Sequence, residues 1–253
     1  MHKRILASIA FVLILSRGAF AAIPLITDDT GTQGKGNIQL ELFGQYAHNS
    51  EPLITTKTGN FSATLTYGII DNVDIILGIP YEAWSTSGSG SESSRGDGFG
   101  DISLEGKWRL YERDDLSVAL KPGFTIPTGD AEKDVGAGRA TYHLLLLATK
   151  KVKSWEFDVN LGYLYNENTD NERKNIWSAS LDAQCEVVKD LKVVLDTGLA
   201  TNPDRSSSTP PVYILGGLIW SVRENLDIGL GIKGGLTKPE TDIAVRGGIT
   251  WRF

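Results

Sequence analysis

The sequence predicts an all-β fold, a transmembrane antiparallel up-and-down β-barrel of about twelve strands. Apolar and polar residues alternate with a period of two from Lys35 to the end of the chain. Short turns alternate along the chain with longer loops rich in Gly, Ser and Asp. Tryptophan residues fall at the ends of the predicted strands, on the apolar face.

The composition narrows the class of protein. The chain has 253 residues, 22% of them charged, a net charge of -6 and a single cysteine. One cysteine excludes an intramolecular disulfide framework and a cysteine-rich zinc site. The acidic balance argues against nucleic acid as a partner. We therefore expect neither a metal nor a cofactor.

Three regions are expected along the chain. Residues 1–21 combine a basic start, a short apolar stretch and small residues at Ala19 and Ala21, and they predict a removed signal peptide of an exported protein. Residues 22–36 are rich in Asp, Thr and Gly, and two interpretations stay open: a periplasmic lead-in, or a plug that folds into the lumen. Residues 37–253 form the predicted barrel.

The strand prediction follows the alternation through the barrel region. Leu104 and Trp108 lie on one face of the segment 101–110, for example, with Glu105 and Lys107 on the other. Each segment is near the length that a tilted strand needs to cross a bilayer. The clearest segments are 37–48, 60–69, 73–81, 101–110, 155–165 and 177–187, and the weaker ones include 116–126, which contains a proline, and 142–149, which is apolar on both faces.

The connections differ in length in a regular way, which is typical of outer-membrane barrels. Short turns are predicted at 71–72, 112–115, 151–154, 189–190 and 223–225. Long loops are predicted at 85–98, 129–138, 166–174 and 202–211, and the first of these is of low complexity. We expect the termini and short turns on the periplasmic side and the long loops outside the cell.

Alternation alone does not say which face points outward, because a soluble barrel shows the same pattern. A lumen enclosed by about twelve strands is too wide for side chains to fill, so the apolar face is expected to contact lipid. The predicted membrane-interface aromatics are Trp108, Trp155, Trp177, Trp220 and Trp251. The predicted partner is thus the lipid bilayer of the outer membrane.

The last residues carry a second signal. Alternation persists to the end of the chain, as expected of a strand that closes a barrel against the first strand. Phe253 behind Trp251 resembles the terminal signature by which bacterial outer-membrane barrels are recognised for insertion. The barrel-insertion machinery is therefore an expected partner.

Several stretches resemble one family. These are "PLITDDTGTQGKGNIQLELF", "YGIIDNVDIILGIPY", "GDGFGDISLEGKWRL" and "FTIPTGD". They are similar to the family of outer-membrane transporters linked to a meta-pathway of phenol degradation, over most of the mature chain. The resemblance implies an outer-membrane channel or transporter for small solutes, with aromatic compounds among them. It supplies no catalytic motif.

Charged residues on the inward face are the candidate pathway residues: Glu41, Glu105, Lys107, Arg109, Asp158, Asp182 and Arg246. They predict either a hydrated, acidic pathway or a lumen closed by mutual salt bridges. A register slip of one residue would move a whole strand's set to the lipid face. The oligomeric state is not predicted.

No catalytic residues are predicted, and we do not expect an enzyme. The only histidines after residue 21 are His48 and His143, and no nucleophile elbow is present. The alternative to a channel is a closed structural or surface-interaction barrel that acts through its long loops. A soluble exported barrel that binds an apolar ligand is a more distant alternative.

Overall fold

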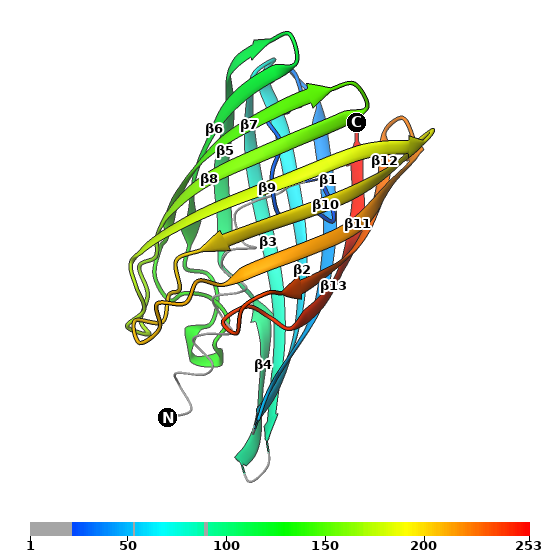
Figure 1. Cartoon of the computed structure of the whole chain (residues 1–253). Helices are drawn as coiled ribbons and strands as arrows, with labels where there is room; N and C mark the ends of the chain where they lie inside the picture. The colour runs from blue at the N-terminus through cyan, green and yellow to red at the C-terminus, as the bar shows by residue number, and fades with distance from the viewer. Residues whose placement is uncertain (1–21, 53, 89–90) are drawn as a thin grey trace.

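The computed structural model describes residues 22–52, 54–88 and 91–253, so the predicted signal peptide lies outside the described residues (Figure 1). The strands are β1 (Ile38–Glu51), β2 (Ile54–Ile70), β3 (Val73–Gly88), β4 (Ser91–Phe99), β5 (Ile102–Arg113), β6 (Leu116–Ile126), β7 (Tyr142–Val152), β8 (Trp155–Tyr165), β9 (Asn175–Val188), β10 (Leu191–Ala200), β11 (Val212–Arg223), β12 (Leu226–Gly235) and β13 (Ile243–Arg252). No helix among the described residues is long and apolar enough to cross a membrane, and the helix they contain is the 3-10 turn η1 (Ala131–Lys133).

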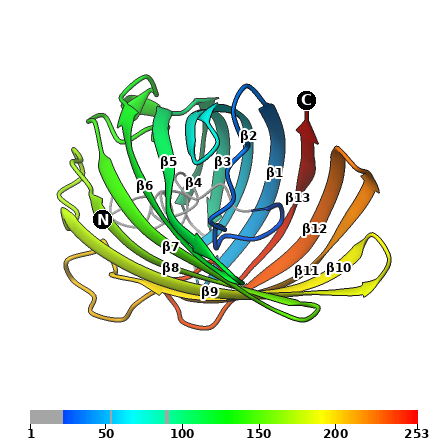
Figure 2. The ribbon, with the colours of Figure 1, turned by 90° about the horizontal axis from the view of Figure 1, so that it is seen from above.

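The strands form one closed antiparallel ring (Figure 2). Neighbours in sequence pair with each other, and β1 closes the ring against β13, where Gln39 lies opposite Arg252. The first half of β3, up to Gly78, pairs with β5, and its second half, from Tyr81, pairs with β4. The segments β4 and β5 therefore act together as one strand interrupted at Gly100 and Asp101. Thirteen segments therefore make a twelve-strand barrel, and the predicted fold is confirmed.

The two faces of the wall differ as the alternation predicts. Outward side chains are mainly apolar and exposed, such as Leu161 and Leu230 at 53% and 61%. Inward side chains are largely polar and buried, although the inward positions of β10 and β11 include Val194, Leu215 and Ile219. The lumen is thus polar over most of its wall and apolar along one side.

The connections confirm the short turns and correct one long loop. Two-residue turns follow β2, β5, β7, β9 and β11. The segment 85–98, predicted as a loop, instead continues β3 to Gly88 and forms β4, which reaches past the rest of the barrel (Figure 1). Composition misled the prediction because Ser and Gly still form backbone pairs when a neighbouring strand is present. Tyr81 and Phe99 also pack edge to face across the hairpin, with ring centroids 5.4 Å apart.

Candidate functional site

Residues 22–36, called the lead-in below, lie inside the barrel (Figure 2). Leu25, Thr27, Asp28 and Thr30 are at most 2% exposed, although they do not themselves belong to a helix or strand. The burial comes from the inner wall, which the lead-in crosses from β11 to β3. The lead-in therefore lies in the lumen, and its role as a plug stays a prediction.

The lead-in begins on the apolar side of the lumen. Leu25 forms a buried cluster with Val194, Tyr213, Leu215 and Ile219, and Ala22 and Ile26 pack against it. Such apolar burial is worth about 1.5–3 kcal/mol for a fully covered leucine. The inward aliphatic residues of β10 and β11 therefore have a partner, and they do not face an empty pore.

Glycines let the chain approach the wall closely. Gly217, Gly229 and Gly231, called the glycine floor below, lie on β11 and β12 directly under Ile23 and Pro24. A Cβ on Gly231 would come within 2.9 Å of Pro24 Cγ, and one on Gly229 would overlap the carbonyl group of Ile23. Glycine inside a strand often marks such a close approach of another backbone.

Asp196 holds the next residues. Its carboxylate accepts hydrogen bonds from the backbone N–H groups of Ile26 (2.6 Å) and Thr27 (2.9 Å) and from the hydroxyl of Thr27 (2.8 Å). The hydroxyl of Tyr213 donates to the same carboxylate at 2.9 Å. Arg246 donates to the carbonyl oxygen of Leu25 at 3.1 Å. These bonds to charged groups are each worth more than neutral ones.

Asp28 lies between two buried lysines. Its Oδ1 is 2.9 Å from Lys107 Nζ and its Oδ2 is 2.9 Å from Lys121 Nζ. Lys121 also contacts Glu105 at 3.0 Å, and the other oxygen of Glu105 lies 3.1 Å from His143 Nε2. Burial opposes the ionisation of Asp28, but the two ammonium groups outweigh it and hold its pKa below the usual range.

The far half of the lead-in reaches β3. Thr30 N–H donates to the hydroxyl of Thr149 at 3.0 Å, and Gln33 N–H donates to the carboxylate of Asp74. Gly36 N–H donates to the carbonyl of Gly68 at 2.8 Å, just before β1 begins. The lead-in is therefore fixed to both sides of the lumen.

The structure places all seven candidate pathway residues on the inner wall, with Arg109 the most exposed. Lys107 and Arg246 contact the lead-in directly. Glu105 contacts it through Lys121, while Glu41 accepts a hydrogen bond from Thr250. Arg109 lies near a short turn and pairs with Glu112 at 3.2 Å. Their proposed role in solute passage stays a prediction.

Asp158 and Asp182 belong to a row of three inward aspartates. Asp182 lies opposite Asp158 on β8 and opposite Asp196 on β10. Asp158 accepts hydrogen bonds from Thr149 and Gln184. Asp182 is 1% exposed, and its polar neighbour besides the two aspartates is Gln184. The row brings three carboxyl groups side by side on the inner wall.

The predicted interface aromatics lie on the outer wall. Trp108, Trp155, Trp177, Trp220 and Trp251 are between 44% and 64% exposed. Phe253 follows the last strand, and its ring packs against Trp251 in a tilted arrangement with centroids 4.6 Å apart. Its backbone N–H donates to the carbonyl of Ile38. Its predicted role as an insertion signal is a question of assembly and stays a prediction.

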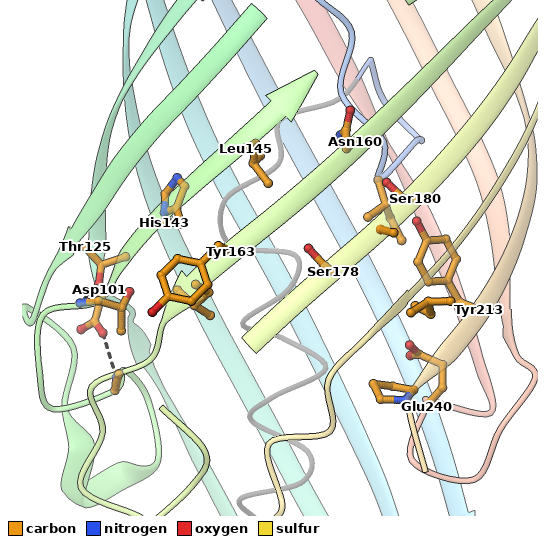
Figure 3. Close-up of a pocket in the computed structure, with 17 residues that line it drawn as sticks. Asp101, Thr125, His143, Leu145, Asn160, Tyr163, Ser178, Ser180, Tyr213 and Glu240 are labelled. Atoms are coloured by element: carbon orange, nitrogen blue, oxygen red, sulfur yellow. Dashed lines mark hydrogen bonds between the residues drawn. The ribbon is translucent and has the colours of Figure 1, made fainter. Parts of the chain in front are cut away.

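A cavity of about 100 Å³ remains on the side of the long loops and is called the loop-side cavity below (Figure 3). Figure 3 shows His143 and Asp101 on one side of it and Tyr213 and Glu240 on the other. Several of its polar groups already have protein partners, since Asp101 accepts from Ala137 N–H and Glu240 pairs with Lys233 at 2.7 Å. Its free walls are therefore mostly apolar, with lining residues such as Ile26, Leu145, Leu164, Ala179 and Pro211.

Sequence reasoning missed the residues that hold the lead-in. Asp28 lies in the segment predicted as a lead-in or plug, and Asp196 and Lys121 are only two of many charged residues of inward parity. Inward parity combined with glycine could have identified the glycine floor. Within the described parts of the chain, no group of three or more His, Cys, Asp or Glu side chains is placed to hold a metal ion.

Solved structures of similar fold are bacterial outer-membrane proteins. An outer-membrane channel from Pseudomonas putida F1 aligns with TM-score 0.68 at 15% identity, covering 89% of this chain and 98% of that one. The NanC porin aligns with TM-score 0.58 at 10% identity, covering 84% and 98%. The translocator domain of the autotransporter NalP from Neisseria meningitidis aligns with TM-score 0.54 at 11% identity, covering 87% and 89%. At these identities the likeness concerns the fold.

A comparison with curated proteins finds no match. A family profile, in contrast, matches residues 24–253, which include the lead-in from Pro24 onward and the whole barrel. The chain therefore belongs to the family described as "Putative MetA-pathway of phenol degradation".

Proposed function

We propose that the protein is an outer-membrane channel for the passive passage of small solutes. The observation that carries this proposal is how residues are divided between the two faces of the barrel, opposite to a soluble barrel. The outer wall is apolar and carries exposed tryptophans, while the inner wall carries buried charged residues. A closed barrel satisfies its backbone groups internally, which lipid requires. Charged side chains inside a membrane-spanning barrel are expected to line a path for water or polar solutes.

The described state is closed, in this proposal, because the lead-in fills part of the lumen. Passage then requires the lead-in to leave the wall or to shift along it. Most of its anchors are hydrogen bonds and ion pairs, which water or a solute can replace. The remaining anchor is apolar, the cluster around Leu25.

Small aromatic compounds are the solutes we favour. The family description concerns phenol degradation, and the loop-side cavity offers apolar walls next to a few polar groups. Such a combination suits a ring that bears one polar substituent. We propose no catalytic step.

We propose that the long loops face outward from the cell and that both termini and the short turns face the periplasm. This can be tested in a Cys185→Ser background with single cysteines at opposite ends, Glu132→Cys in η1 and Asp114→Cys in a short turn. An impermeant maleimide should label the first on intact cells and the second only after lysis. The reverse pattern would overturn the orientation.

A separate test concerns assembly. Phe253→Ala should lower the fraction of the protein that is assembled in the outer membrane if Phe253 is the insertion signal.

The channel itself is tested by conductance of the purified mature protein in a planar bilayer under a salt gradient. We expect discrete steps, rare in the wild type because the lead-in is docked. The reversal potential reports the ion preference of the lumen. The proposal would be overturned if the protein inserts into the bilayer but does not conduct, both as wild type and in variants whose lead-in is undocked.

One observation favours the alternative of a closed surface-interaction barrel. The ends of β2, β3 and β4 project beyond the other strands and present a paired sheet (Figure 1). A barrel that never conducts, yet loses a cell-surface property when this projection is shortened, would support that alternative.

A further inference from the structure

The two buried lysines of the lumen are neutralised in different ways. Lys121 has a carboxylate of the wall beside it, Glu105 at 3.0 Å. Within residues 22–52, 54–88 and 91–253, every ion pair of Lys107 is made with the lead-in, to Asp28 at 2.9 Å and to Asp29 at 3.9 Å. Lys107 is only 7% exposed. The carboxylates in direct contact with its ammonium group thus belong to a segment that has to move if the channel opens, while the wall carboxylates Asp74 and Glu41 act on it from farther away.

Removal of one partner from a buried ion pair is strongly unfavourable, because it leaves an uncompensated charge in a poorly hydrated place. An open lumen would therefore hold Lys107 and Lys121 with one negative charge missing between them. The vacated position has a defined shape: two oxygens of one carboxylate, each 2.9 Å from a different ammonium nitrogen. A ligand that supplies the same two oxygens would restore the balance.

We propose that Lys107 and Lys121 form a binding site for the carboxylate group of a small organic solute, and that Asp28 occupies this site as an internal ligand. The solute and the lead-in compete for the two lysines, so arrival of a carboxylate stabilises the undocked lead-in. This inference rests on the proposed channel function and names a class of solute for it.

The surroundings fit a carboxylate attached to an apolar body. Asn160, whose side-chain amide can pair with the backbone of Asp28, also lines the loop-side cavity. His143 lines the same cavity and contacts Glu105, the wall partner of Lys121. A solute held at the lysines therefore has apolar walls close by for its remaining atoms. Benzoate is a suitable probe, and benzamide is its neutral counterpart of almost equal shape.

The test compares Asp28→Asn with Asp29→Asn, the same chemical change one residue along on a side chain that is 36% exposed. Binding of benzoate to the detergent-solubilised full mature chain is measured by calorimetry. Because the wild-type site is competent only when the lead-in is undocked, removing the internal competitor should tighten benzoate binding by about tenfold or more. Asp29→Asn should gain far less, because the Asp29 carboxylate lies 3.9 Å from Lys107 and does not bridge the two lysines. Benzamide should not distinguish the variants.

Adding Lys107→Gln to Asp28→Asn should abolish the gain. Equal benzoate affinity in wild type and Asp28→Asn, or an equal gain for benzamide, would overturn the site. If Asp28→Asn does not fold, hydrogen exchange on the wild type decides instead. Benzoate, but not benzamide, should then speed exchange of the Thr27 and Thr30 amides, and no difference between the two probes would count against the site.

Conductance separates this inference from the proposed function. If benzoate binding requires Lys107 but the barrel never conducts, the carboxylate site is supported and the proposed channel function is overturned. If Asp28→Asn channels conduct but bind benzoate no better than the wild type, the channel function is supported and the carboxylate site is overturned.

Discussion

Substitution of Gly229 by alanine should release the start of the lead-in without damaging the barrel. The new Cβ points into the lumen, where it would overlap the carbonyl group of Ile23 and lie 2.9 Å from the nitrogen of Pro24. Real Cβ atoms do not approach backbone so closely, so residues 22–25 must lift away. The floor itself cannot yield, because Gly229 is paired on both sides within the sheet.

The magnitude follows from what residues 22–25 lose. Leu25 is 2% exposed, and uncovering it costs about 1.5–3 kcal/mol. The hydrogen bond from the Arg246 guanidinium to the carbonyl of Leu25, 3.1 Å long, contributes about 1.5–3 kcal/mol because the donor is charged. Together they amount to about 3–6 kcal/mol. Even the lower figure raises the undocked fraction about 100-fold.

Hydrogen exchange followed by mass spectrometry measures this directly. The amides of Ile26 and Thr27, which donate to Asp196 in the docked state, should exchange about 100-fold faster in Gly229→Ala. The matched control is Gly216→Ala on the adjacent strand, where a Cβ meets nothing within 4 Å. Bilayer conductance should rise in the first variant alone. Unchanged exchange in Gly229→Ala, with the barrel intact, would refute the account of how the lead-in is held.

Three further outcomes are expected. Leu25→Ala should weaken docking by about 2–3 kcal/mol, seen as faster exchange of the lead-in amides with an unchanged melting temperature of the barrel. Asp182→Asn should raise the melting temperature, because it removes a buried carboxyl group crowded between those of Asp158 and Asp196; Asp196→Asn, which loses the hydrogen bonds to the lead-in, should lower it, and equal shifts of the two would contradict this reasoning. Leu230→Arg, on the outer wall, should destabilise the membrane-inserted barrel by about 2–4 kcal/mol in urea unfolding from vesicles, and a neutral result would show that this face does not contact lipid.

The barrel was predictable from the sequence because its signal is local. Alternation in the segment 101–110 already separates the outward Trp108 from the inward Lys107, and the ring only repeats this separation. The short turns were predictable for the same reason.

The sequence left the place of the lead-in open between two interpretations and did not predict its anchors, because these are contacts between residues far apart in sequence. Asp28 meets Lys107 and Lys121 about 80 and 90 positions later, and Leu25 meets Leu215 almost at the other end of the chain. The composition of residues 22–36 is also that of a periplasmic segment without fixed contacts. Neither periodicity nor turn residues indicate a partner on the opposite side of the lumen. The hairpin of β3 and β4 was missed for a related reason: the pairing of a Ser- and Gly-rich strand comes from its neighbour.

The path of the lead-in also bears on the mechanics of the barrel. Gly217 on β11 and Lys107 on β5 lie on opposite sides of the ring, and the lead-in contacts both. A hydrogen-bonded ring resists stretching along its circumference but flattens easily into an ellipse under the lateral pressure of a bilayer. A chain fastened across the diameter acts as an internal brace and fixes the shape of the cross-section. Release of the lead-in would therefore do more than clear space: spin labels on β5 and β11 should show a broader distribution of distances, and the pore would become more deformable as it opens.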